Sequence, residues 1–175
     1  MDVDPTTAKA LGWPKAKYAW VERERRWLCG GVPHERVIRA ERFTDLYITG
    51  TQLRLREAVP IGGGETMRRL GRKADVSGAV RLLTSIYLSP DEFALLAKMP
   101  GRTLQKIRYY LGPTNDVEVS VDQFGAELDG LFLAEAEFDS MEAMQAYSTP
   151  PFCMQEVTDD LRYTGGQLVL NGPPR

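Results

Sequence analysis

Eight strand-like segments follow one another along the chain, and short turn-forming sequences separate them. The separators include "PIGGGE", "VSG" and "GPTN", whose glycine, proline and asparagine residues favour tight reversals. Short reversals join antiparallel neighbours, because a parallel connection needs a crossover of a dozen or more residues. The sequence therefore predicts a mainly β protein with an antiparallel sheet. The expected strands are residues 18–28, 36–47, 52–58, 66–75, 79–88, 103–111, 116–124 and 131–138.

Helix signals interrupt this series twice. Residues 89–101 begin with Ser89 as an N-cap, place Glu92 three residues later, and end at a glycine, so we predict a helix there. A shorter helix is predicted to begin after Ser140, and the tail after residue 151 is expected to mix loop with some helix. Residues 1–17 show no sustained period, so we expect a loosely packed N-terminal arm before a main domain of residues 18–175.

The composition describes one globular protein. The chain has 175 residues, is 43% hydrophobic and carries a formal net charge of -2. It has no apolar run that could cross a bilayer and no secretory pattern at its start, so we expect a cytoplasmic protein without a membrane partner. Its near-neutral charge makes nucleic acid an unexpected partner. The sequence leaves open whether the chain forms a homodimer.

Charged residues repeat at every second position in several of the predicted strands. In "VERERRWL", Glu22, Glu24 and Arg26 fall on one face of an extended chain, because alternate side chains share a face. The same alternation places cations on one face of each middle strand and acids on one face of a late strand. These sets are Arg54 with Arg56, Arg69 with Lys73, Lys106 with Arg108, and Glu135 with Glu137.

These charged faces have two interpretations. For any single strand, a solvated outer face is the ordinary explanation. However, like charges two residues apart repel one another, and here acids and bases are segregated onto different strands. A sheet of about eight strands can close into a barrel with a polar interior. Bases lining that interior would bind a polyanion, and its carboxylates would bind a divalent metal.

The ordered motifs resemble a known family. Glu22-x-Glu24-x-Arg26 is similar to the ExExK signature of the CYTH domain, the triphosphate tunnel metalloenzyme superfamily. "TGTQLRLRE", "GRK", "LQKIRYYL", "LFLAEAEF" and "EVTDDLRY" follow in the order of that family. The resemblance runs from about Tyr18 to the C-terminus. It departs from the family pattern at Arg26, where the signature has lysine, and a guanidinium cannot give up its proton as an amine can.

The resemblance implies an eight-stranded antiparallel tunnel that holds a triphosphate and Mg²⁺ or Mn²⁺. It implies catalytic roles for Glu24, Arg26, Lys73 and Glu156. The implied metal ligands are Glu22, Glu24, Glu135, Glu137 and Glu156, with Asp122 as a further tunnel acid. The implied phosphate-binding residues are Arg54, Arg56, Lys73, Lys106 and Arg108, with Arg81 adding to the basic wall.

The activity that the resemblance implies is metal-dependent hydrolysis of a terminal phosphate. The substrate would be inorganic triphosphate, or an organic one such as a nucleoside or thiamine triphosphate. Two alternatives stay open at this point. One is an adenylate cyclase of the class IV type, which forms cyclic AMP and pyrophosphate from ATP. The other is a polyphosphate- or nucleotide-binding module without turnover.

Overall fold

The computed structural model of the protein describes residues 3–113 and 117–174. None of the helices within these residues has the length and apolar character needed to cross a bilayer. The strands are β1 (Trp20–Cys29), β2 (Val37–Ile48), β3 (Leu53–Ile61), β4 (Met67–Asp75), β5 (Val80–Tyr87), β6 (Gly101–Leu111), β7 (Val119–Phe124), β8 (Phe132–Glu137) and β9 (Cys153–Glu156). The helices are α1 (Pro5–Ala10), α2 (Pro90–Leu96), α3 (Met141–Ala146) and α4 (Gly165–Asn171), and the 3-10 turns are η1 (Ala16–Tyr18), η2 (His34–Arg36), η3 (Ala126–Leu128) and η4 (Leu161–Tyr163).

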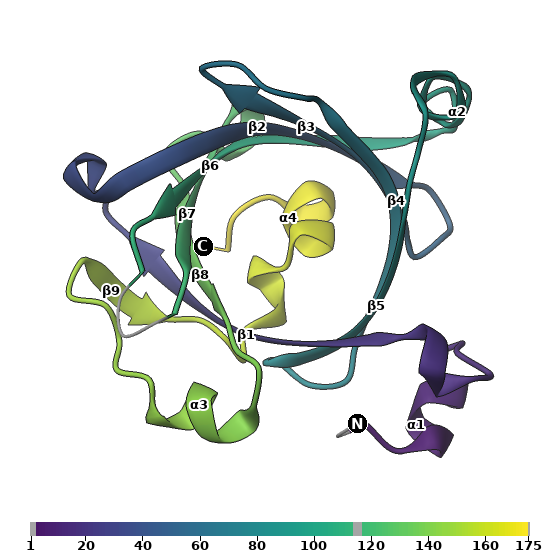
Figure 1. The fold of residues 1–175 in the computed structure, drawn as a ribbon, viewed down its shortest axis with the longest axis horizontal. Helices are drawn as coiled ribbons and strands as arrows, with labels where there is room; N and C mark the ends of the chain where they lie inside the picture. Colours follow the sequence, from purple (N-terminus) through teal and green to yellow (C-terminus); the bar gives the residue numbers. More distant parts are fainter. Residues whose placement is uncertain (1–2, 114–116, 175) are drawn as a thin grey trace.

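Eight of the strands close into a barrel. Their order is β5-β4-β3-β2-β6-β7-β8-β1, and β1 pairs again with β5 to complete the ring. Every pair is antiparallel, and Figure 1 shows the ring viewed from one end. The short strand β9 is not part of the ring. It pairs with the last residues of β1, on the edge of β1 that β8 does not occupy. The predicted eight-stranded antiparallel barrel is therefore confirmed.

The predicted elements match the observed ones to within a few residues. All eight expected strands are present, and the expected helices after Ser89 and Ser140 are α2 and α3. The strand expected from Asp116 is β7, which begins at Val119, and Asp116 itself lies outside the described residues. Strand β9 was not predicted, because a strand of four residues is too short to show a period.

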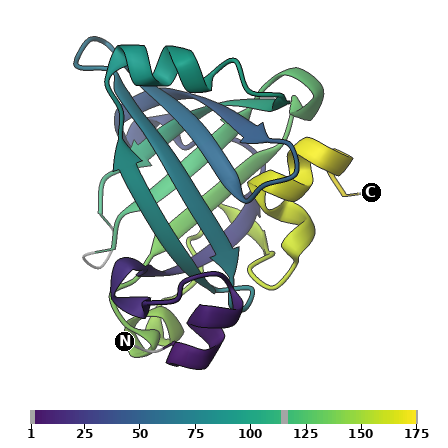
Figure 2. The same ribbon diagram turned by 90° about the vertical axis from the view of Figure 1, so that its right-hand side faces the viewer.

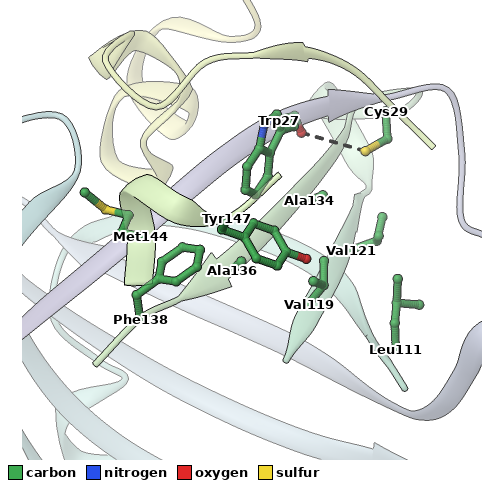
Figure 3. Packing of buried hydrophobic residues seen from close by; sticks show 10 residues of the cluster. All are labelled: Trp27, Cys29, Leu111, Val119, Val121, Ala134, Ala136, Phe138, Met144 and Tyr147. Carbon is green, nitrogen blue, oxygen red and sulfur yellow. Dashed lines mark hydrogen bonds between the residues drawn. The ribbon is translucent and has the colours of Figure 1, made fainter. Parts of the chain in front are cut away.

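The outer face of β1 is covered by an apolar cluster beneath α3. Trp27 is fully buried there, and the rings of Phe138 and Tyr147 pack edge to face with centroids 5.3 Å apart. Figure 3 shows these side chains together with Met144 of α3, which belongs to the same cluster. The cluster lies outside the ring, so the opposite face of β1, with Glu22, Glu24 and Arg26, points into the barrel.

A C-terminal plug, which we define as residues 157–171 with η4 and α4, lies across one end of the barrel (Figures 1 and 2). Leu168 of α4 is buried against the inward-facing Leu104 and Leu133. Gly165 begins α4 so close to β2 that a Cβ there would lie 2.2 Å from the Tyr47 hydroxyl. Arg102 donates hydrogen bonds to two α4 carbonyls. The plug thus closes this end with an apolar layer.

The N-terminal arm differs from the expectation of loose packing. The Asp4 side chain caps α1 by accepting hydrogen bonds from the backbone of Thr6 and Thr7. Trp13 is buried against Leu82 of β5, and its Nε1 donates to Thr84 Oγ1 at 2.7 Å. The expectation of loose packing was therefore wrong. The arm is held by a contact between residues 71 positions apart, and such a contact leaves no local period in residues 1–17.

Candidate active site

The strand register brings most of the predicted site residues to the inner face of the barrel. Directly opposed residues of antiparallel strands lie on the same face, so the pairs can be followed around the ring from Glu24 and Arg26. Every predicted site residue except Glu156 lies on this face. They are Glu22, Glu24, Arg26, Arg54, Arg56, Lys73, Arg81, Lys106, Arg108, Asp122, Glu135 and Glu137.

Three inner carboxylates form an acidic cluster. Glu22, Glu24 and Glu137 each offer an oxygen atom, and these atoms lie within 4.8 Å of one another. Glu22 and Glu24 are buried, whereas Glu137 is exposed at the end of β8. Although its side chain is partly exposed, the surrounding protein displaces water from Glu137, and this desolvation together with the charges of Glu22 and Glu24 raises the pKa of Glu137. Clustered carboxylate oxygens are the donors that Mg²⁺ and Mn²⁺ prefer, so the chemistry of these residues fits a divalent cation.

Basic side chains hold the two buried members of this acidic cluster. Lys73 Nζ contacts Glu22 Oε2 at 2.5 Å, and Arg81 contacts Glu24 while its Nε lies 2.7 Å from Asp75 Oδ1. Burial tends to raise the pKa of Glu22, but the charges of Lys73 and Arg81 outweigh it and the net shift is downward. Glu22 is therefore ionised at neutral pH, as a metal ligand must be.

Arg26 is attached to the C-terminal plug as well as to the acidic cluster. Its side chain is almost fully buried, and its Nε lies 3.2 Å from Glu24 Oε1. Its backbone nitrogen donates to Thr158 Oγ1 at 3.0 Å, and its Nη2 donates to the Thr158 carbonyl at 3.2 Å. Arg26 therefore fixes Glu24 relative to the plug. Sequence reasoning missed Thr158, because its partner lies 132 positions away.

Asp122 and Glu135, two of the predicted metal ligands, both contact bases. Asp122 is fully buried, forms an ion pair with Lys106, and accepts two hydrogen bonds from Arg108 at 2.7 and 2.6 Å. Glu135 contacts Arg108 as well. Burial tends to raise the pKa of Glu135, but the Arg108 and Lys106 charges hold it well below its ordinary value. Neither residue belongs to the acidic cluster. Both orient the bases that they contact, and their role as metal ligands stays a prediction.

Glu156 lies outside the barrel, on the face opposite to the acidic cluster, which contradicts its predicted place among the metal ligands and catalytic residues. It is paired directly with Trp27, whose side chain is on the outer face. Its carboxylate accepts hydrogen bonds from Arg25 at 2.8 and 2.6 Å and from the Thr158 hydroxyl at 2.7 Å. The cause is the pairing of β9 with the edge of β1, which turns Glu156 away from the interior.

A second group of inner cations comes from β3 and is anchored by an acid that sequence reasoning missed. Asp45 of β2 accepts two hydrogen bonds from Arg56, each 2.6 Å long, and is 1% exposed. Burial tends to raise the pKa of Asp45, but the charges of Arg56 and Arg54 outweigh it and lower the pKa. Asp45 alternates with Phe43 and Tyr47 along β2, so its strand face mixes acid with aromatic residues. That mixture gave no charge pattern to recognise.

The inner face thus carries two chemically distinct regions. The acidic cluster of β1 and β8 can hold a divalent cation, and Arg54, Arg56, Lys106 and Arg108 present cationic groups beside it. Guanidinium and ammonium groups bind phosphate oxygens through charge-assisted hydrogen bonds. An enclosed face of this kind can bind a compact polyanion together with its counter-cation.

Comparison with known proteins agrees with this arrangement. No protein-family model matches the chain. The chain is 32% identical over 158 residues to an inorganic triphosphatase of Nitrosomonas europaea, which covers 87% of this chain and 99% of the relative. A crystal structure of an inorganic triphosphatase matches with a TM-score of 0.59 and 30% identity over 87% of this chain and 97% of that one.

A more distant structure, described as a putative adenylate cyclase of Bacillus halodurans, matches with a TM-score of 0.51. Its identity is 15% over 73% of this chain and 86% of that chain, so it shares the fold alone. The decisive likeness is the one to the triphosphatase, because it spans nearly the whole length of that relative. The chain therefore belongs to the family of the Nitrosomonas europaea inorganic triphosphatase.

Proposed function

We propose that this protein is a metal-dependent inorganic triphosphatase of the CYTH, or triphosphate tunnel metalloenzyme, superfamily. The observation that carries the proposal is the meeting of a three-carboxylate cluster and several anchored cations on the inner face of one closed barrel. In the proposed reaction, water attacks the terminal phosphorus of triphosphate. The bond from that phosphorus to the bridging oxygen breaks, and the products are orthophosphate and pyrophosphate.

The basic residues have the task of binding and orienting the phosphate chain. Arg54, Arg56, Lys106 and Arg108 would neutralise the phosphate oxygens, which favours phosphoryl transfer because the barrier is mainly one of positioning and charge. Asp45 and Asp122 hold three of these cations in fixed geometry before substrate arrives. Such preorganisation spares the protein the cost of ordering long side chains during binding.

The acidic cluster would hold the metal. Glu22, Glu24 and Glu137 supply its proposed ligands, and Mg²⁺ or Mn²⁺ is the ion of choice for such oxygen donors. When bound, the ion would polarise the phosphoryl oxygens as a Lewis acid. Lys73 and Arg81, which contact Glu22 and Glu24, keep two of the three ligands oriented. Arg26 adds a permanent positive charge beside Glu24.

A panel of substrates and metals tests the proposal. The purified protein is incubated with inorganic triphosphate or ATP, in the presence of Mg²⁺, Mn²⁺ or EDTA, and the products are separated. We expect orthophosphate from inorganic triphosphate with either metal and none with EDTA. Cyclic AMP and pyrophosphate from ATP would instead identify a cyclase. Binding of triphosphate without any product would identify a binding module.

A further inference from the structure

Arg69 lies on the inner face of β4 and has no role in the site described above. It is paired directly with Arg56 of β3 and with Tyr87 of β5, so all three share the inward side. Along β4 this face reads Arg69, Gly71 and Lys73. Arg69 is half-buried and lies near the start of β4, next to the β3–β4 turn. The C-terminal plug lies at the other end of β4, beside the β4–β5 turn.

Arg69 has cations as its nearest charged neighbours on the inner face. Asp45 is the acid of this region, and both of its oxygens are engaged by Arg56. Across residues 3–113 and 117–174, no carboxylate forms an ion pair with Arg69. Burial and the neighbouring charges of Arg56 and Arg54 lower its pKa. Arg69 therefore lies beside two further guanidinium groups, with Asp45 already bound by Arg56, and an added anion would relieve their mutual repulsion.

Gly71 brings backbone without a side chain to the inner face beside these cations. It is paired with Arg54 and separates Arg69 from Lys73, and it contributes no side chain to the inner face. A Cβ on Gly71 would come within 3.4 Å of Ser85 Oγ. Glycine inside a strand weakens the strand and often marks a place where a ligand approaches the backbone. Arg69 and the backbone of Gly71 are therefore neighbours on the inner face.

We propose that Arg69 is an additional phosphate-binding residue of this protein. It contacts the phosphoryl group at the end of the substrate that lies farthest from the acidic cluster. Lys73 contacts Glu22 in that cluster, and Arg69 is four residues away along the strand, about 13 Å at the usual rise of a strand. The ligand of Arg69 is thus the distal phosphate of a linear phosphate chain. This inference rests on the proposed function.

Metal-free binding of inorganic triphosphate tests the inference, with Arg68 as the matched control. Arg68 is the preceding residue, lies on the outer face, and donates to Glu57 at 2.8 Å. In titration calorimetry with EDTA present, Arg69→Gln should weaken triphosphate binding about tenfold, the loss typical of one charge-assisted hydrogen bond. Arg69→Lys should fall between wild type and Arg69→Gln, and Arg68→Gln should bind as wild type does.

Thermal unfolding without ligand supplies an independent readout. Since Arg69→Gln removes repulsion with Arg56 and Arg54, its melting temperature should equal or exceed that of wild type. Arg69→Gln binding within twofold of wild type would overturn the inference while leaving the proposed function intact. A lower melting temperature together with lost binding that Arg69→Lys does not restore would assign Arg69 a structural role and also overturn it. Wild type that binds no triphosphate, with or without Mg²⁺, would overturn both proposals.

Discussion

The two faces of strand β1 are held by different interactions and serve different purposes. On the outer face, Trp27 is fully buried in an apolar cluster with Tyr147 and Phe138. On the inner face, Glu24 and Arg26 are also buried, but among charged groups. Burying apolar surface stabilises a fold directly, whereas burying ion pairs yields little net stability. The difference indicates that the outer face stabilises the barrel, whereas the proposed binding of triphosphate explains why charged groups are buried on the inner face.

The largest expected effect is on activity, from a change on the inner face. Because Glu137 belongs to the acidic cluster, Glu137→Gln should reduce metal-dependent triphosphate hydrolysis by at least about 100-fold, the scale of losing one preorganised charged group in an active site. Phosphate release with Mg²⁺ or Mn²⁺ measures it. Glu57→Gln, which alters an acid that pairs with Arg68 on the outer face, should leave the rate unchanged.

The same variant should be at least as stable as wild type. The folded-state pKa of Glu137 is raised above its ordinary value of 4.5, so the folded protein binds this proton more tightly than the unfolded chain. Ionised Glu137 therefore lowers the free energy of unfolding as pH rises through that window. Glu137→Gln removes this penalty at neutral pH. A variant that lost activity only because it unfolded would contradict the placement of Glu137 in a binding site.

A change on the outer face should have the opposite signature. Trp27→Ala should lower the free energy of unfolding by about 3–5 kcal/mol, because it leaves a cavity beneath α3. Urea unfolding measures the loss. Below its melting temperature the variant should retain wild-type affinity for triphosphate. A selective loss of triphosphate affinity in well-folded Trp27→Ala protein would break the distinction between the two faces.

Asp45 lies on the inner face, yet its loss should destabilise the fold. Asp45→Asn should cost about 3 kcal/mol at neutral pH, because it leaves the buried Arg56 charge unpaired. The folded-state pKa of Asp45 lies below its ordinary value of 3.8. The contribution of ionised Asp45 to the free energy of unfolding is therefore fully present above pH 3.8 and is lost as pH falls toward the folded-state pKa. Urea unfolding should show a smaller difference between wild type and Asp45→Asn at about pH 3 than at neutral pH. An equal difference at both values would mean that the pair is not ionic.

The smallest effect is expected at Glu156. This acid pairs with Arg25 on the outer face, where its side chain is 38% exposed, so Glu156→Gln should change stability by no more than about 1 kcal/mol. Its hydrolysis rate should stay within twofold of wild type in the phosphate-release assay. A loss as large as that of Glu137→Gln would show that the tail moves Glu156 into the site during turnover.

The sequence predicted the barrel strands and the charged face because both depend on alternation within one strand. Arg54 and Arg56, or Glu135 and Glu137, share a face whatever their neighbours are. The partners of these residues depend on the register between distant strands, which is why Asp45 could not be assigned to Arg56. The contacts of Asp122 with Lys106 and of Glu135 with Arg108 were not predicted, for the same reason.

The errors at the two ends of the chain have a related cause. Glu156 faces outward because β9 takes its orientation from Trp27 of β1, more than a hundred residues earlier. The N-terminal arm packs because Trp13 reaches Thr84. Neither contact leaves a local pattern. The boundary between arm and domain, the cytoplasmic location and the homodimer stay predictions from the sequence.

The central claim is that acids and bases on the inner face act together on one triphosphate. A crystal structure with inorganic triphosphate and Mn²⁺ tests it most directly, because the anomalous signal of manganese identifies the ion. We expect manganese bound by Glu22, Glu24 and Glu137, and phosphate oxygens within hydrogen-bonding distance of Arg54, Arg56 and Lys106. Triphosphate bound on the outside of the barrel, or manganese bound by other residues, would contradict the account.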